Sequence, residues 1–380
     1  MIEQFTFYSN LTFAIVTFIL ALFFISFPVN DDLVLKNYKI SLKILAISYF
    51  SITSVIILGL IFKTSDGNKS IFSFLDILIA SLQALLFGFT LVTLVNPFLL
   101  TFKNIVKQLL PIIIFSILII LPSFFIEILK IEKISIFYKI IRDSSIILNF
   151  LFLLFYIFQL IYFSILILKE FKKYKNKLEN YFSDTQKLNL KWVKYAYFAS
   201  LIIAVSALIS MFFSNEIISI IFTIVFILFY LFFALEYIKY TNIYIQIKPV
   251  IEIIDYNTKE ENKNQTAKSR FNWSDLKSNI IEEKYYLKES VNIEEIAQWL
   301  SIGRTTLSNF INSEEKMNFN SWINSLRIED SKNILIENPQ KTVAEISEMV
   351  GFSEQSNFSK QFKLITGESP SSWRKKSLVF

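Results

Sequence analysis

Long apolar runs occupy roughly the first 240 positions of the chain and then stop. Seven runs of about 18 or more residues lie near positions 5–27, 41–62, 71–95, 109–126, 144–168, 193–213 and 217–238. A helix of about 20 residues rises about 30 Å, the thickness of the hydrocarbon core, and satisfies its own backbone hydrogen bonds within lipid. The pattern predicts an all-α chain that begins with a polytopic membrane bundle of about seven transmembrane helices, residues 1–238.

Basic residues favour one orientation of this bundle. Loops one, three and five carry Lys residues, most densely between Lys169 and Lys191, while the N-terminus and the loop between spans six and seven carry none. Positively charged loops stay in the cytoplasm. The N-terminus is therefore predicted outside and the C-terminus inside a bacterial inner (cytoplasmic) membrane, although the basic residues of loop four, 127–143, disagree.

Loop five has its own pattern. Phe171, Tyr174, Leu178 and Tyr181 recur at helical spacing among seven basic residues from position 169 to 191, as in an interfacial helix. Two interpretations stay open: a topology signal, or a relay that carries a change in the bundle to the C-terminal part of the chain.

A few polar residues interrupt the apolar runs. Such groups are costly in lipid unless they face the interior of the bundle, where they are candidates for binding a ligand. Asp76 and Gln83 lie seven residues apart and share one helical face, so this pair is the predicted site for an unknown effector.

The apolar pattern ends after residue 238. Pro249 is expected to interrupt any helix there, and residues 255–269 are polar and charged with hardly any aliphatic side chain. Residues 239–271 are therefore predicted to be a cytoplasmic linker.

Short amphipathic helices follow from residue 272 to 380. After an apolar stripe that begins at Trp273, the periodicity predicts helices at 293–300, 304–312, 320–337, 343–350 and 354–366. Asn292 with Glu295, and Thr342 with Glu345, have the spacing of a capping box, so each first helix of a pair has a start signal. The arrangement is two helix pairs joined by one long helix.

Each pair has the pattern of a helix-turn-helix. In the first, small Ala297 allows close approach of the helix that carries Leu307 and Phe310. In the second, Gly351 is predicted to make the turn and Ser353 to cap the helix that follows.

The C-terminal residues also resemble a known family. The run GFSEQSNFSKQFKLITGESPSSWRK is similar to the C-terminal signature of AraC-type (AraC/XylS) regulators, and IEEIAQWL, TTLSNF and LRIEDSKNIL resemble the other parts of that module in the same order. The resemblance covers about the last 100 residues and implies two recognition helices that enter successive major-groove segments of one DNA duplex. Gly303 departs from it, because the family usually has a capping Ser or Thr there.

Residues opposite the buried stripes are the predicted DNA contacts. Gln and Asn can read adenine edges, Arg and Lys can bind guanine or phosphate, and Ser or Thr mainly position a helix on the backbone. The candidates are Arg304, Thr305, Ser308 and Asn309 in the first recognition helix, and Gln355, Ser356, Ser359, Lys360 and Lys363 in the second.

Composition narrows the chemistry further. The chain has no Cys and no His, so thiolate nucleophiles, imidazole bases and Cys/His metal sites are absent, and we expect no enzyme, no metal and no cofactor. The net charge of +6 belongs to the apolar half, since 11 basic and 12 acidic residues balance from Lys288 to the end. Non-specific DNA affinity should be weak.

These patterns together favour a membrane-embedded one-component transcription regulator. Its expected partners are promoter DNA, the lipid bilayer and an effector, with a homodimer and RNA polymerase as further candidates. A transporter- or receptor-like protein whose helical tail docks a protein partner is the alternative.

Overall fold

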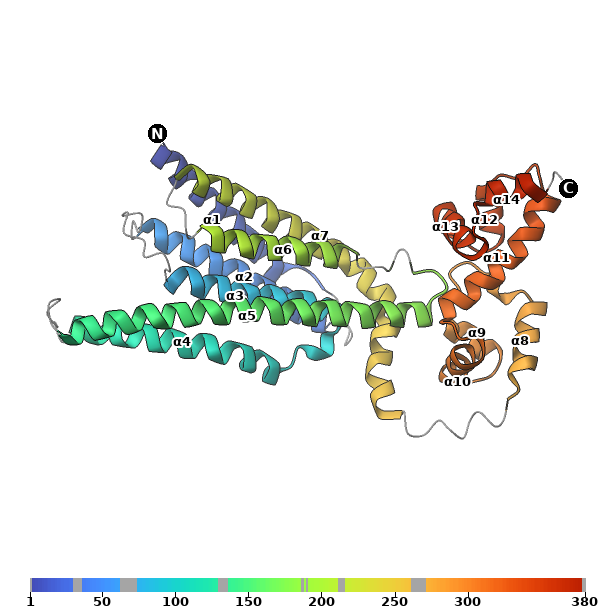
Figure 1. The fold of residues 1–380 in the computed structure, drawn as a ribbon, viewed down its shortest axis with the longest axis horizontal. Coiled ribbons are helices and arrows are strands. Elements are labelled where there is room, and N and C mark those ends of the chain that lie inside the picture. Colours follow the sequence, from blue (N-terminus) through green and yellow to red (C-terminus); the bar gives the residue numbers. More distant parts are fainter. Residues whose placement is uncertain are drawn as a thin grey trace. The chain divides into compact units, whose positions relative to one another are not determined.

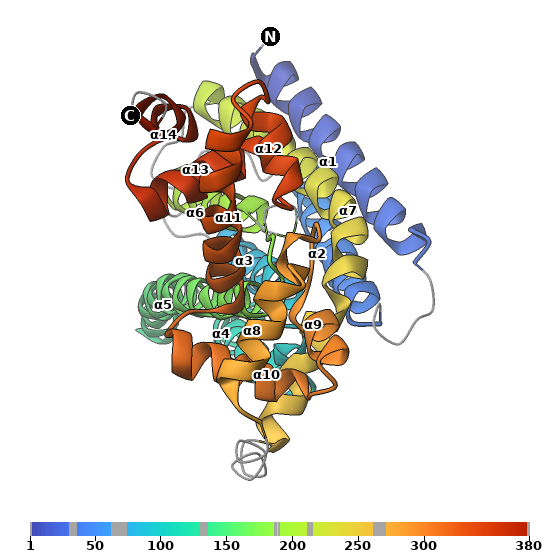
Figure 2. The same ribbon diagram turned by 90° about the vertical axis from the view of Figure 1, so that its right-hand side faces the viewer.

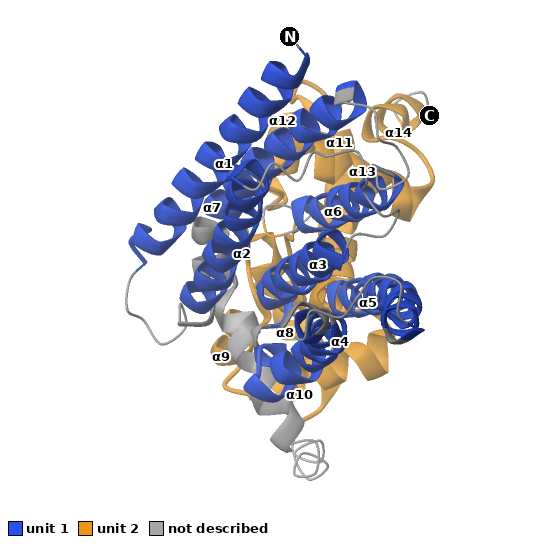
Figure 3. Cartoon of the chain, turned by 90° about the vertical axis from the view of Figure 1, so that its left-hand side faces the viewer, with its two compact units in different colours: residues 1–172, 190–245 blue, residues 173–189, 246–380 orange. Residues whose placement is uncertain are grey.

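The protein was analysed as a computed structural model that describes residues 2–29, 36–61, 74–128, 136–185, 188, 191–210, 216–260 and 271–377. Within these ranges the chain is helical, with a single isolated antiparallel bridge between Phe182 and Asn292 and no strand. It divides into two compact units (Figure 3). Unit 1 contains residues 1–172 and 190–245, and unit 2 contains residues 173–189 and 246–380.

Seven helices of the described chain are long and apolar enough to cross a membrane. This confirms the predicted number. They are α1 (Ile2–Ser26), α2 (Lys36–Ile61), α3 (Phe74–Val95), α4 (Phe102–Ile128), α5 (Ile136–Tyr181), α6 (Lys191–Ser210) and α7 (Glu216–Glu260) (Figure 1).

The core of unit 1 surrounds α3, the most buried of these helices. Ile77, Leu85 and Phe89 of α3 pack with Phe152 and Phe163 of α5 in one apolar cluster. Gly88 makes this contact close, because a Cβ at that position would lie 2.5 Å from the Phe163 ring. The side chains of α4 are mostly exposed, as expected for a helix surrounded by lipid.

Two helices extend beyond the expected spans. α5 continues to Tyr181, so the first half of loop five is part of a membrane-length helix rather than a separate one. α7 continues to Glu260 through Pro249, where a helix can accommodate proline by losing one backbone hydrogen bond and bending. The expected linker, 239–271, is thus helical over its first part, and residues 261–270 lie outside the described ranges.

Unit 2 contains the short helices. α11 lies between two helix pairs, α9 with α10 and α12 with α13 (Figures 1 and 2). The helices of unit 2 are α8 (Trp273–Glu282), α9 (Ile293–Trp299), α10 (Arg304–Phe310), α11 (Phe319–Glu337), α12 (Val343–Met349), α13 (Gln355–Thr366) and α14 (Pro370–Ser377). Unit 2 also has a 3-10 turn at Tyr285–Leu287 and a π-helical segment at Ile311–Glu315. The five helices predicted between 293 and 366 are all present.

Candidate nucleic-acid interface

The first helix pair begins at a capped terminus. The Asn292 side chain accepts the Glu295 amide at 3.0 Å and donates to the Glu295 carboxylate at 2.6 Å. Ile296 and Leu307 are fully buried between α9 and α10. Gly303 is the N-cap of α10 and offers no side-chain acceptor, as expected from its sequence.

The turn of this pair depends on Ser301. Its φ of 56° is left-handed, and the Ile302 amide then donates to the Ala297 carbonyl at 2.9 Å. The sequence pattern did not identify Ser301, because a serine rarely adopts this conformation and carries no turn signal by itself.

The second pair has the same turn geometry. Thr342 and Glu345 form the full reciprocal capping box, in which the Thr342 amide donates to the Glu345 carboxylate at 2.6 Å. Gly351 takes the left-handed position at φ 85°, and the Phe352 amide donates to the Ser347 carbonyl at 2.9 Å. The two pairs are therefore one motif used twice.

Gly351 also permits a close approach of the chain to itself. A Cβ there would lie 2.3 Å from the Leu287 carbonyl oxygen. The second turn therefore packs directly on the segment between α8 and α9.

Arg327 of α11 stabilises this junction. Its guanidinium is fully buried, donates to the Tyr286 carbonyl at 2.7 Å and the Lys288 carbonyl at 2.8 Å, and lies over the Phe352 ring. Burial lowers the pKa of Arg327 to about 10. A charge buried this deeply needs these acceptors, since desolvation of an ion is costly. Sequence reasoning did not single out Arg327, because its acceptors are backbone carbonyls about 40 residues away.

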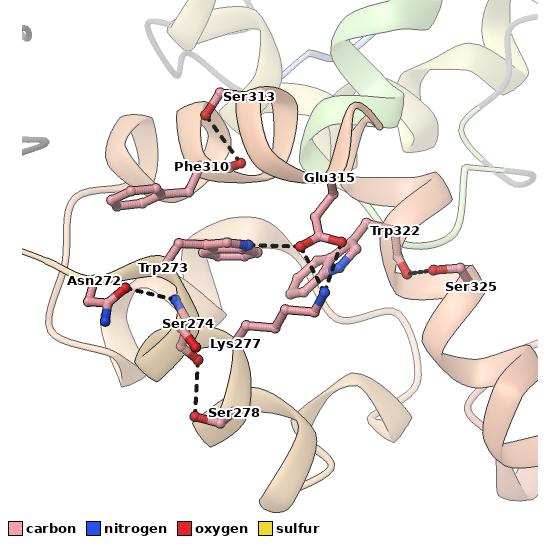
Figure 4. Close-up of polar contacts among 10 residues, drawn as sticks. All are labelled: Asn272, Trp273, Ser274, Lys277, Ser278, Phe310, Ser313, Glu315, Trp322 and Ser325. Atoms are coloured by element: carbon pink, nitrogen blue, oxygen red, sulfur yellow. Dashed lines mark hydrogen bonds and ion pairs between the residues drawn. The ribbon is translucent and has the colours of Figure 1, made fainter.

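α8 attaches to the first motif through aromatic stacking and one shared carboxylate. The Trp273 ring lies parallel to Phe310 at 5.7 Å and tilted against Trp322 at 5.4 Å. Glu315 accepts the Trp273 indole N–H at 2.8 Å and pairs with Lys277 at 2.9 Å (Figure 4). The predicted apolar stripe that begins at Trp273 is thus part of the core of this unit.

The outward faces of α10 and α13 are polar. Of the nine predicted contact residues, none is buried: Asn309, Gln355, Ser356, Lys360 and Lys363 are exposed, and Arg304, Thr305, Ser308 and Ser359 are half-buried. The opposite faces carry the core residues, such as Phe358 and Phe362 of α13. The structure therefore groups the predicted contacts on two separate polar faces, one for each motif.

Arg304, Lys360 and Lys363 form no salt bridge within the described residues, although other lysines of unit 2 do. Burial lowers the pKa of Arg304, and Tyr181 and Glu294 act in the opposite direction. Lys360 and Lys363 are exposed and available to an anionic partner, whereas Arg304 is half-buried.

Two details of the second motif were not predicted. The N-cap of α13 is Glu354 rather than Ser353, and its side chain makes no cap hydrogen bond. Ser353 instead donates to the Asp184 carboxylate.

α14 begins at Pro370, a residue favoured at the first position of a helix, and places Trp373 against Phe362.

Asp76 and Gln83, the predicted effector residues, have different surroundings in unit 1. Asp76 is exposed in the first turn of α3. Gln83 donates to the Ser48 carbonyl at 3.0 Å and to Ser51 at 2.8 Å, while its carbonyl accepts from Ser48 at 2.5 Å and Tyr230 at 3.1 Å. Gln83 therefore joins α2, α3 and α7.

The comparisons with known proteins concern the C-terminal part of the chain. Residues 296–376 match a family model described as a helix-turn-helix domain. Over 86 residues the chain is 37% identical to the Msm operon regulatory protein of Streptococcus mutans serotype c, an alignment that covers 23% of this chain and 31% of the relative. The chain thus spans about a third of that relative's length. No solved structure matches the chain. Residues 296–376 are a helix-turn-helix domain of the AraC type.

Proposed function

We propose that this protein is a membrane-embedded transcription regulator that binds double-stranded DNA with α10 and α13. The observation that carries the proposal is the repeated motif: two helix pairs with the same turn geometry, each presenting a polar helix face. In helix-turn-helix proteins the second helix of each pair enters the major groove and meets base edges with its N-terminal residues.

The two recognition helices are proposed to read successive major-groove segments. α11 has 19 residues and is therefore about 28 Å long. With the flanking turns it can separate two helices by about 34 Å, one turn of B-DNA. The buried Arg327, which bonds α11 to the segment between α8 and α9, supports this separation.

Within each face the residue types suggest different roles. Gln355 at the start and Lys360 in the middle of α13 are exposed and are proposed to read base edges. Arg304 at the start of α10 is proposed to bind guanine or phosphate, and the hydroxyl residues Thr305, Ser308, Ser356 and Ser359 to position the helices on the backbone.

Unit 1 is proposed to lie in the bacterial cytoplasmic membrane, with unit 2 in the cytoplasm. The length and apolarity of seven helices support the first part, and the basic residues of loops one, three and five support the second. A regulator with this architecture senses a signal in the bundle or outside it and changes the engagement of promoter DNA by unit 2.

The proposal is tested with the full chain in lipid nanodiscs. A randomised pool of about 40-base-pair duplexes is long enough for two successive major-groove segments. We expect a specific sequence to be enriched, and Gln355→Ala or Lys360→Ala to lose about 1–3 kcal/mol of discrimination at single base pairs. Glu282→Ala, exposed on α8, is the control. No enrichment from the pool would contradict the proposal and favour a protein partner for unit 2.

A further inference from the structure

The last residues of α5 belong to unit 2. Tyr181 of this segment is hydrogen-bonded to Glu294, which lies 113 residues further along the chain. We call residues 173–185 the α5 arm. Leu178, Tyr181 and Ser183 of the arm are buried. The arm is therefore packed into unit 2 rather than resting on its surface.

The arm contacts the first motif at the start of α9. Phe182 forms the antiparallel bridge with Asn292, and the Ser183 amide donates to the Val291 carbonyl at 3.1 Å. The Tyr181 hydroxyl donates to the Glu294 carboxylate. In complexes of this motif the first helix of a helix-turn-helix crosses the DNA backbone.

The arm also contacts α11 and the second motif. Asn320 donates to the Ser183 carbonyl at 2.6 Å, and Arg327 donates to the Ser183 hydroxyl at 3.4 Å. The Asp184 carboxylate accepts from Ser353, the second residue before α13. One short segment thus joins both motifs.

One of these contacts lies at the start of the recognition helix α13, and others lie at the start of α9, the first helix of the first motif. Arg304, the first residue of α10, is half-buried, whereas Gln355 of α13 is exposed. Asp184 places a negative carboxylate beside the start of α13, where the helix dipole and the backbone amides attract an anion. A DNA phosphate would require the same surroundings and would be repelled by that carboxylate.

We propose that the α5 arm is an autoinhibitory segment: docked between the two motifs it excludes DNA from the starts of α9 and α13, and DNA binding requires its release. This inference rests on the proposed DNA-binding function and adds its regulation. Because the arm is the end of a helix whose earlier part belongs to unit 1, a change in the bundle that pulls or rotates α5 shifts the balance between docked and released arm. The apparent DNA affinity equals the intrinsic affinity multiplied by the fraction of molecules in which the arm is released.

A reversible disulfide tests the proposal. The Ser183–Val291 hydrogen bond makes Phe182 and Asn292 a non-hydrogen-bonded antiparallel pair, for which Cα atoms lie about 4.5 Å apart. This separation suits a disulfide. Since the natural chain has no Cys, the double variant Phe182→Cys with Asn292→Cys has one pair of thiols only.

The measurement is binding of a duplex selected by the reduced double variant from the randomised pool, with the full chain in nanodiscs. Oxidation should lock the arm and weaken binding at least about tenfold, as expected if little of the protein remains competent, and reductant should restore it. The single variants Phe182→Cys and Asn292→Cys, oxidised in the same way, are the controls for lost packing and lost capping. Equal affinity of the oxidised and reduced double variant would overturn the proposal.

A second variant removes the charge without a crosslink. Asp184→Asn should tighten binding of the same duplex severalfold, because a neutral amide competes less well for the start of α13 than a carboxylate. Glu337→Gln, exposed on α11, removes one negative charge elsewhere in unit 2 and should change affinity far less. Weaker binding by Asp184→Asn would show that the arm braces the DNA-binding surface and would contradict autoinhibition. If neither the wild type nor any reduced variant selects a duplex, the proposed function fails, and this inference fails with it.

Discussion

The two units of the molecule use polar and apolar residues in opposite ways. In unit 1 large apolar side chains such as Ile202 and Phe158 are 66% and 65% exposed, while Ser81 and Gln159 are buried and hydrogen-bonded to each other at 2.7 Å. In unit 2 the apolar Ile346 and Phe362 are fully buried, and polar residues such as Asn309 and Gln355 are exposed on the recognition helices. The comparison supports the proposal that the chain is built for two solvents, since apolar surface is favourable in lipid and costly in water.

The largest difference should appear when apolar side chains are truncated in both units. Phe362→Ala removes a fully buried ring and should lower the free energy of unfolding of unit 2 by about 3–5 kcal/mol. Ile202→Ala in α6 removes a lipid-exposed side chain and should change unit 1 little. Tryptophan fluorescence during denaturation can report the unfolding of unit 2 alone. Four of the five tryptophans lie in unit 2, and the substitution Trp192→Phe removes the one in unit 1. A similar loss in both variants would contradict the two-solvent interpretation.

Two glycines of unit 2 sharpen the account of the second motif. Gly351 and Gly367 both have φ 85°, but a Cβ at Gly351 would meet the Leu287 carbonyl, whereas a Cβ at Gly367 would meet nothing within 4 Å. Gly367→Ala should cost about 1–2 kcal/mol, the penalty of a left-handed residue. Gly351→Ala should cost clearly more, because the packing of the turn on the segment after α8 must also open. Equal losses in denaturant melts would show that this close packing contributes nothing.

In unit 1 the polar interior should be the sensitive part. Gln83→Ala removes four hydrogen bonds among α2, α3 and α7, and bonds between membrane helices are worth about 0.6 kcal/mol each on average. A total loss of about 1–2 kcal/mol is expected, since such bonds are not additive. Detergent-induced unfolding in bicelles measures it. Ser54→Ala, whose hydroxyl bonds only within its own helix and is exposed, should be neutral, and an effect as large as that of Gln83→Ala would argue against an interior role for Gln83.

The smallest effect concerns the capping box of α12. Thr342→Ala should lower the stability of unit 2 by about 1 kcal/mol. The backbone and side chain of Thr342 hold the pKa of Glu345 below its ordinary value of 4.5. A depressed pKa means that the folded state favours the carboxylate, so this contribution is present above pH 4.5 and is lost as the pH falls through the lowered value. Melts at decreasing pH should show the difference between wild type and Glu345→Gln shrinking, and a constant difference would contradict this.

Local sequence patterns predicted much of the fold. Seven apolar runs became seven helices, and Thr342, Glu345 and Gly351 marked the second motif correctly. What the patterns did not predict depends on contacts between distant residues. Ser301 adopts its left-handed φ because the buried helices on each side of it determine the turn, and Arg327 is buried because carbonyls of another segment accept its hydrogen bonds.

The function of loop five could not be decided from its own sequence for the same reason. Its amphipathic spacing suited both a topology signal and a relay. The contacts that bear on this choice join Tyr181 and Asp184 to residues more than 100 positions further along the chain. That the nine residues predicted to contact DNA lie away from the buried face was easier to predict, because helical periodicity separates a buried face from an exposed one.

The most direct test of the central claim is a methylation-protection footprint of the full chain, in nanodiscs, on a duplex selected from the randomised pool. Two protected major-groove patches about 10 base pairs apart are expected for one copy of unit 2, with the patch nearer α13 weakened by Lys360→Ala. One patch, or no protection on any selected duplex, would contradict a repeated motif that grips consecutive grooves.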